Sequence, residues 1–395
     1  PFARLADLFG RKKVFILGLA LFGISTFLCG LSFSGTMLIA LRALAGLGSA
    51  MMFGTSMAIL VSIFPPAHRG KVIGINTSVV YFALASGPFL GGLLTQHAGW
   101  QSLFFLVGLL GIVVAIFAMT IFKQEWTEAK GEHFDYIGST IYAAGLFGLI
   151  FGFSKLPDVS GFILTAAGIV CVIVFVICEL KEKQPIFNVR IFSGNKIFGL
   201  SCLSALVNYA CTSAVAFMLS LYLQYIRGFT PQNAGLILIV QACVQCVTSF
   251  YAGRLSDRLN PATLATSGMG IIVVGLTGLI FVTPCSSMAF IVLLLFLLGF
   301  GFGLFSSPNS NVIMSSVDKK YYGQASATMG TMRLTGQAFS MGIATMAISL
   351  SMGNRIITPE LHEDFMKSFH ITFIIFTVLC MAGTYTSSFR LKKNS

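Results

Sequence analysis

Twelve long apolar runs constrain this sequence more than any other feature. A helix that crosses a membrane needs about 20 mostly apolar residues, and each run has close to that length or more. Only 10% of the residues are charged and 56% are hydrophobic, whereas soluble domains carry about 25% charged residues. We therefore predict an all-α integral membrane protein with spans at 13–33, 36–63, 72–94, 101–122, 136–154, 160–179, 198–223, 233–253, 263–283, 288–310, 324–351 and 369–389.

The basic residues are distributed unevenly between the loops that join these runs. If the segment before the first run lies inside the cell, nineteen Lys and Arg residues fall in inside segments and four fall outside, at Lys155, Arg227, Arg355 and Lys367. Cytoplasmic loops carry such an excess, so we predict a multi-pass plasma-membrane protein with both ends of this chain in the cytoplasm. The basic residues form no continuous stripe, so we expect no nucleic-acid partner despite a net charge of +12.

A charged segment precedes the first run, and a similar one follows 250 positions later. The first reads RLADLFGRKK at 4–13 and the second reads GRLSDR at 253–258. An acidic residue, basic residues and a glycine favour a tight polar turn at a helix boundary, and each aspartate lies near the start of the following helix. The residues that we expect to form this conformational-switch loop are Asp7, Gly10, Arg11, Lys12, Asp257 and Arg258.

The first charged segment resembles the signature loop of the major facilitator superfamily. Asp7, Gly10, Arg11 and Lys12 match that motif, whereas Leu8 stands where an arginine is usual. The resemblance implies two pseudo-symmetric helical bundles that transport a small molecule by alternating access. It also implies that the aspartate of the loop pairs with basic groups and stabilises one facing state.

The order of the runs differs from the usual twelve-span layout of that family, because the signature loop precedes the first run. Four runs, a charged linker at 123–134, two runs, a second linker at 180–197 and six runs follow. This order resembles the fourteen-span drug/proton antiporter branch without its first two spans; a twelve-span variant with a shortened first half is the alternative. We predict an N-terminal bundle at 1–122, a linker with two inserted helices at 123–197 and a six-helix bundle at 198–395.

Two further resemblances lie in the second and third runs. The segment that starts at Arg42 resembles the fourth-span motif of the family, which implies a role in proton coupling. An arginine at membrane depth costs about 2.5–3.5 kcal/mol, so we expect Arg42 to face the bundle interior or water, and we give Arg333 the same kind of role. The segment 83–92, ALASGPFLGG, resembles the antiporter motif of the family.

This antiporter-like segment predicts a hinge or seal between two helices. Ala83, Gly87 and Gly91 are four residues apart and share one helix face, where small residues let two backbones approach closely. Pro88 removes a backbone donor and bends a helix. We therefore select Gly87, Pro88, Gly91 and Gly92 as the residues of this motif.

Several amide side chains also lie inside the apolar runs. Polar groups at membrane depth either tie helices together or line a cavity, so we predict a substrate cavity with candidates Gln241, Gln245, Asn208, Asn309 and Gln337. The chain has 38 Phe residues, and aromatic side chains suit hydrophobic or cationic cargo.

The thirteen acidic residues all lie in predicted loops or at span ends. A proton-coupled carrier normally keeps a titratable carboxylate inside the membrane, so we expect that group upstream of Pro1. No catalytic motif or metal-ligand cluster appears in the runs, and we expect no enzyme activity, cofactor or metal. We predict a monomeric, proton-coupled exporter of hydrophobic or cationic drugs; a carrier of another metabolite or siderophore, or an inactive truncated remnant, are the alternatives.

Overall fold

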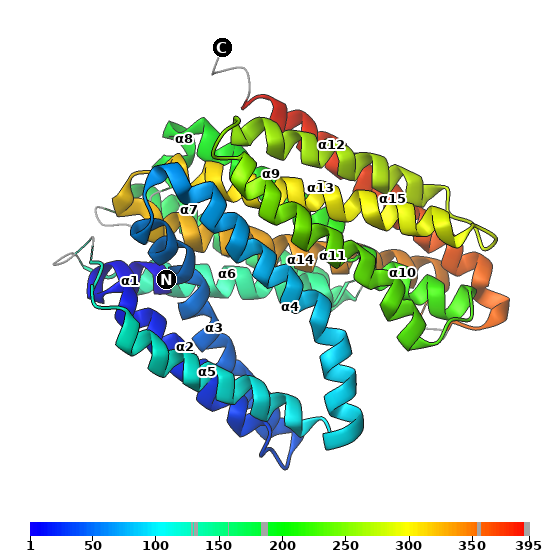
Figure 1. The fold of residues 1–395 in the computed structure, drawn as a ribbon, viewed down its shortest axis with the longest axis horizontal. Helices are drawn as coiled ribbons and strands as arrows, with labels where there is room; N and C mark the ends of the chain where they lie inside the picture. The colour runs from blue at the N-terminus through cyan, green and yellow to red at the C-terminus, as the bar shows by residue number, and fades with distance from the viewer. Residues whose placement is uncertain (128, 130–132, 157, 183–188, 354–356, 391–395) are drawn as a thin grey trace. The chain divides into compact units, whose positions relative to one another are not determined.

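The computed structural model consists of helices joined by short connections (Figure 1). It describes residues 1–395 except 128, 130–132, 157, 183–188, 354–356 and 391–395, and it describes only the backbone at 85, 88, 89, 92, 93, 96, 154, 191 and 193. The described residues contain no β-strand. The predicted all-α fold is therefore confirmed.

The helices follow the apolar runs closely. Each predicted run falls on one long helix, except that the run 198–223 falls on three consecutive helical segments. The elements are α1 (Phe2–Phe9), α2 (Arg11–Cys29), α3 (Gly35–Ile63), η1 (Pro66–His68), α4 (Arg69–Ala98), α5 (Gln101–Ile121), α6 (Tyr136–Ser154), α7 (Val159–Lys181), α8 (Arg190–Gly194), α9 (Lys196–Thr212), α10 (Val215–Leu221), η2 (Tyr222–Ile226), α11 (Pro231–Leu255), α12 (Pro261–Ile280), α13 (Met288–Ser315), η3 (Lys319–Tyr321), α14 (Tyr322–Met352), η4 (Pro359–Leu361) and α15 (His362–Ser388).

Ten helical segments of the described residues are long and apolar enough to cross a membrane, which is two fewer than predicted. The two predicted spans that are not among them lie on α4 and α14. Both helices are longer than the roughly 20 residues that a span requires, with 30 and 31 residues. Helix α14 includes Gln324, Arg333 and Gln337 and many small polar residues, which lower its hydropathy.

The chain divides into two compact units, and two of the boundaries between them fall inside α4 and α14. The first unit contains residues 1–66, 84–135 and 317–330. In it, α2 packs against α3 and α5 through glycines that leave no room for a side chain. A Cβ atom at Gly48 would lie 2.6 Å from the amide nitrogen of Phe22, and one at Gly108 would lie 2.5 Å from that of Phe27.

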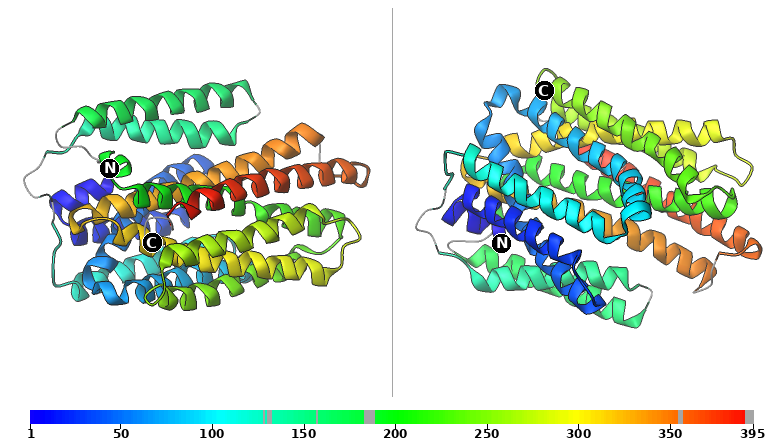
Figure 2. Two further views of the ribbon diagram at one scale, coloured as in Figure 1. Left: turned by 90° about the horizontal axis from the view of Figure 1, so that it is seen from above. Right: turned by 60° about the horizontal axis from the view of Figure 1, so that its bottom comes forward.

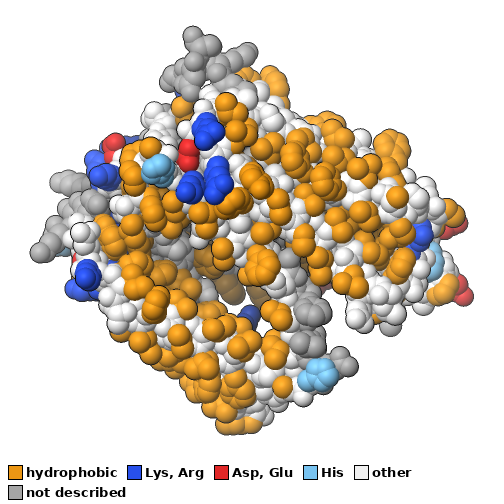
Figure 3. All heavy atoms as spheres, viewed as in Figure 1, with side chains coloured by type: hydrophobic (Ala, Val, Ile, Leu, Met, Phe, Trp, Pro, Cys, Tyr) orange, Lys and Arg blue, Asp and Glu red, His pale blue; other side chains and the backbone are white. Residues whose placement is uncertain are grey.

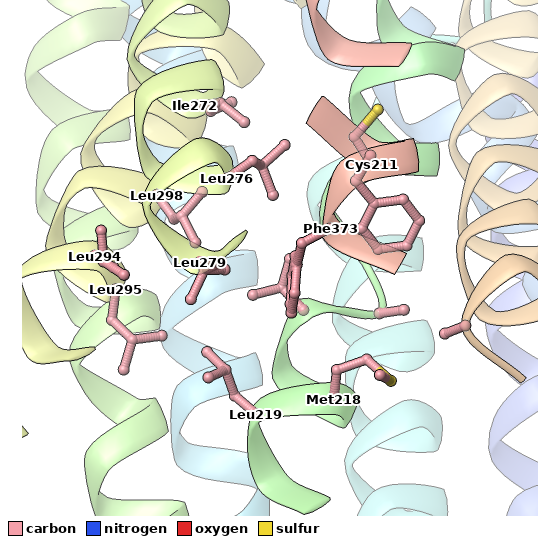
Figure 4. Packing of buried hydrophobic residues seen from close by; sticks show 14 of the residues in the cluster. Cys211, Met218, Leu219, Ile272, Leu276, Leu279, Leu294, Leu295, Leu298 and Phe373 are labelled. Atoms are coloured by element: carbon pink, nitrogen blue, oxygen red, sulfur yellow. The ribbon is translucent and has the colours of Figure 1, made fainter. Parts of the chain in front are cut away.

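The second unit contains residues 67–83, 136–316 and 331–395. Its core lies around α12, which packs against α13 and α15, and the leucines of α12 and α13 belong to the same buried cluster as Phe373 of α15 (Figure 4). Helices α6 and α7 form an antiparallel pair (Figure 2). These two helices occupy the predicted linker region, of which 128, 130–132, 157 and 183–188 lie outside the described residues.

The face of the molecule shown in Figure 3 is largely hydrophobic, with Lys and Arg side chains in a few separate places. On α5, the exposed side chains include Leu109, Leu110, Ile116 and Phe117, each more than half exposed. Exposed apolar side chains of this kind are favourable against lipid hydrocarbon and unfavourable against water. The structure therefore supports a multi-pass membrane protein.

Candidate functional site

Asp257 caps a helix that lies far away in the sequence. It follows the end of α11, and its carboxylate oxygens accept hydrogen bonds from the backbone amides of Gly70 at 2.7 Å and Lys71 at 2.8 Å. Both amides belong to the first turn of α4, where backbone donors have no partner within the helix. The positive end of the helix dipole also favours a carboxylate at this position.

Glycines allow α4 and α11 to meet at this point. A Cβ atom at Gly253 would lie 2.5 Å from the Cα atom of Gly74 and 2.6 Å from the carbonyl oxygen of Gly70. A Cβ atom at Gly70 would lie 2.5 Å from the carboxylate of Asp257. The backbones of the two helices therefore touch, which brings Asp257 within reach of the start of α4.

Asp7 occupies a similar position near the start of α14. Its carboxylate pairs with the guanidinium of Arg11 at 2.7 Å, and both side chains are buried. A Cβ atom at Gly323, in the first turn of α14, would lie 2.6 Å from the carboxylate of Asp7. Arg11 also donates to the hydroxyl of Ser62 at 3.2 Å and to the carbonyl of Lys319 at 3.4 Å.

The geometry of the turn differs from the prediction in two ways. The segment that we expected to be a polar loop is helical up to Phe9, and a single residue, Gly10 with φ of +116°, separates α1 from α2. The aspartates were expected to act on the helices that directly follow them. Instead, the N-cap of α2 is Gly10 and that of α12 is Asn260. The carboxylates of Asp7 and Asp257 face the starts of helices that are distant in the sequence.

Glu125 was not among the predicted site residues. Its carboxylate accepts a hydrogen bond from the backbone amide of Lys12 at 2.8 Å, and the ammonium of Lys12 donates to the carbonyl of Phe122. The backbone of Trp126 accepts a bond from the amide of Arg11 at 2.9 Å. The start of the charged linker thus folds onto the turn, and no local pattern indicates a contact over such a sequence distance.

The remaining charged candidates are less enclosed. Arg42 lies in the second turn of α3, is exposed, and is close to Cys29. Arg258 is also exposed. Arg333 on α14 is half-buried and lies near Tyr81.

Tyr81 belongs to an aromatic and polar cluster that sequence reasoning missed. Its hydroxyl lies 3.2 Å from that of Ser306, and its ring meets Phe302 edge-on with 5.7 Å between centroids. Phe302 meets Tyr209 in the same way at 5.4 Å. The residues come from α4, α13 and α9, and Arg333 from α14 lies near them, so this is where the second unit brings charge and hydroxyl groups together.

The antiporter-like segment lies in the second half of α4, which continues as one helix from Arg69 to Ala98. No described atom lies within 4 Å of a Cβ atom built at Gly87, and the nearest to one at Gly91 lies at 4.0 Å, on Leu103. The close packing that we predicted for this face, which also includes Ala83, stays a prediction. At Pro88 and Gly92 only the backbone is described, and the predicted role of the motif in exchange stays a prediction.

Asn309, a predicted cavity residue, is instead tied to a buried arginine. Its amide oxygen accepts a bond from the guanidinium of Arg390 at 2.6 Å, and its amide nitrogen donates to the carbonyl of Ser201 at 3.1 Å. Arg390 is 2% exposed, although it follows the last apolar run and is one of the nineteen basic residues that the prediction placed in inside segments. Burial lowers the pKa of Arg390 to about 10, so the group is still charged at neutral pH.

The glutamine candidates differ in exposure. Gln245 is buried, whereas Gln241 and Gln337 are half-buried. The backbone of α11 contacts α13 at both glutamines. A Cβ atom at Gly299 would lie 2.4 Å from the carbonyl oxygen of Gln241, and one at Gly303 would lie 2.9 Å from that of Gln245. A cavity role for the three side chains stays a prediction.

The stability of an Asn208 variant tests the predicted role of this residue in a cavity. Its side chain is fully buried, and among the described residues neither amide atom has a hydrogen-bond partner. An unsatisfied buried polar group costs about 1–3 kcal/mol, so we expect Asn208→Leu to stabilise the protein and raise its melting temperature in detergent by a few degrees. Asn195→Leu is the control and should destabilise, because Asn195 caps α9 and bonds the carbonyl of Ser316. A lower melting temperature for Asn208→Leu would contradict the expectation.

These features define a helical membrane protein in which both sequence halves carry an aspartate placed against a distant helix start. The chain belongs to the Major Facilitator Superfamily, whose family model matches residues 1–341. It is thus a multi-pass membrane transporter.

Individual relatives support this assignment. The chain is 26% identical over 351 residues to the riboflavin transporter RibZ of Clostridioides difficile, covering 87% of this chain and 74% of that protein. It is 27% identical over 348 residues to the multidrug resistance protein Stp of Mycobacterium tuberculosis, covering 86% and 64%. The crystal structure of the human organic anion transporter MFSD10 (TETRAN) shares the fold, with a TM-score of 0.71 at 14% identity, covering 98% of this chain and 79% of that chain.

Proposed function

We propose that this protein is a proton-coupled antiporter of the fourteen-span branch, which exports hydrophobic or cationic drugs by alternating access. The observation that carries the proposal is the matched placement of Asp7 and Asp257. Each carboxylate lies against the first turn of a helix from the other half of the sequence. Contacts of this kind hold one facing state closed and must break when the transporter opens on that side.

The similarity to a multidrug resistance protein supports a drug as cargo. The similarity to a riboflavin transporter favours a second candidate, a carrier of a planar metabolite. Arg42 and Arg333 act in coupling or carry the cavity charge in either case, and Gly87, Pro88, Gly91 and Gly92 act in exchange. The cytoplasmic orientation of both chain ends and the monomeric state belong to the same proposal.

Transport by proteoliposomes tests both candidates. With a proton gradient imposed, we expect ethidium to be exchanged for protons and the exchange to stop when a protonophore collapses the gradient. Asp257→Asn should slow exchange about tenfold or more, because it weakens charge-assisted bonds worth about 1.5–3 kcal/mol each. Asp318→Asn is the control, because Asp318 is exposed and makes no capping bond in the described structure. Gradient-independent riboflavin uptake without ethidium exchange would refute the drug antiporter.

A further inference from the structure

An apolar groove runs between α11 and α13 on the outside of the second unit. It has a volume of about 530 Å³, and its walls include Val247, Tyr251 and Leu255 from α11 and Phe296, Phe300 and Leu304 from α13. Val247 and Tyr251 are more than half exposed. A groove with such a lining does not hold water, so in a membrane it takes a hydrocarbon group.

The length of the groove matches one leaflet of a bilayer. Its α11 wall extends from Cys243 to Leu255, and twelve steps of about 1.5 Å along a helix give about 18 Å. The hydrocarbon core of a bilayer is about 30 Å thick, so half of it is about 15 Å. One acyl chain of a phospholipid therefore fits the groove from end to end.

Two arginines lie at the end of the groove that Leu255 forms. Arg254 lies on the same face of α11 as Val247, seven residues away, and its guanidinium rests 4.3 Å from the centroid of the Phe250 ring. Arg258 follows in the turn, and both side chains are exposed. In the described part of the chain, neither arginine forms an ion pair, and the nearby carboxylate of Asp257 is bound to the amides of Gly70 and Lys71.

We propose that this groove binds an anionic phospholipid, with one acyl chain between α11 and α13 and the phosphate on Arg254 and Arg258. Guanidinium groups bind phosphate oxygens through two parallel hydrogen bonds. Basic residues where a groove meets the head-group region select anionic lipids in this way. This inference does not depend on the cargo or coupling ion proposed above.

Native mass spectrometry of the purified protein tests the site with two lipids of the same chain length. We expect phosphatidylglycerol to bind more tightly than phosphatidylcholine. A basic residue near the membrane surface contributes about 1 kcal/mol to the binding of anionic lipid, so Arg254→Gln should weaken phosphatidylglycerol binding about fivefold. Arg254→Lys keeps the charge and should keep most of the affinity. Lys13→Gln is the control, because Lys13 is an exposed basic residue at the start of another helix, and it should have no effect.

A second variant addresses the acyl chain. Val247→Trp fills the groove and should weaken both lipids, with circular dichroism and gel filtration confirming the fold. If that variant misfolds, a phosphatidylglycerol with a photoreactive group in its acyl chain provides the readout, and we expect it to label the peptide that spans 243–255. Equal binding of the two lipids with no effect of Arg254→Gln would overturn the proposal, and so would labelling elsewhere or a second copy of the chain in the groove.

Discussion

Adding one methyl group at Gly253 should separate α4 from α11. A Cβ atom there would lie 2.5–2.9 Å from Gly74 and from the carbonyl of Gly70. These are backbone atoms, which cannot move aside unless the helices part. Overpacking costs about 1–3 kcal/mol, and separation also breaks the bonds from Asp257 to the start of α4. We therefore expect Gly253→Ala to destabilise this contact by about 3 kcal/mol. The equilibrium constant for forming the contact should fall about 100-fold.

Hydrogen exchange of the backbone amides of Gly70 and Lys71 measures that contact directly, because these amides donate to Asp257. The control is Gly235→Ala on the same helix, since no described atom lies within 4 Å of a Cβ atom at Gly235. In a helix interior this change favours folding by up to about 1 kcal/mol. The same added atom should therefore act in opposite directions at the two positions, and equal exchange rates in the two variants would show that the helices do not touch there.

The fold was predictable because its signal is local and long. An apolar run of about 20 residues indicates a helix wherever its neighbours are, and the range predicted for α6 is the one observed, 136–154. Polar ends were harder to predict. Helix α15 begins at His362 rather than 369, because its first turn contains Glu363 and Asp364, and carboxylates stabilise a helix start although they are not apolar.

The candidate site was predictable only on one side of each contact. The resemblance of the first charged segment to the family's loop implies that Asp7 pairs with basic groups, and the repeat locates Asp257. Their partners, Gly323 and Gly70, take part through backbone atoms and because they have no side chain. Neither glycine belongs to a charged group or motif that could be recognised in the sequence. The same internal repeat offers one signal, because Gly70 and Gly323 are separated by nearly the same sequence distance as Asp7 and Asp257.

The burial of Arg390 could not be predicted either. It follows the last apolar run and looks like an orientation signal, yet it donates to Ser201, Asn309 and Ser387. Those three partners come from α9, α13 and α15 and carry no charge. A helix sequence does not indicate which of its small polar residues will meet a distant guanidinium.

Removing Asp7 should strongly destabilise the first unit. The side chains of Asp7 and Arg11 are 1% and 0% exposed, with 2.7 Å between them. Asp7→Ala leaves a buried guanidinium without its counterion, which costs about 3–5 kcal/mol. The control is Asp364→Ala, because the pair of Asp364 and Lys367 has a similar distance, 3.0 Å, but is exposed. That change should cost less than about 1 kcal/mol. Similar losses in chemical denaturation of the two variants would contradict the burial of the first pair.

A double variant separates the structural role of this pair from its role in transport. Replacing a buried ion pair by apolar residues of similar size is often neutral or stabilising, so we expect Asp7→Leu with Arg11→Met to recover most of the stability that Asp7→Ala loses. The carboxylate against Gly323 is still missing in that protein, and α14 has lost the charge at its first turn. Exchange in proteoliposomes should therefore remain slow although the fold is restored. If exchange recovers together with stability, Asp7 serves the fold alone, and the conformational switch must be sought at Asp257.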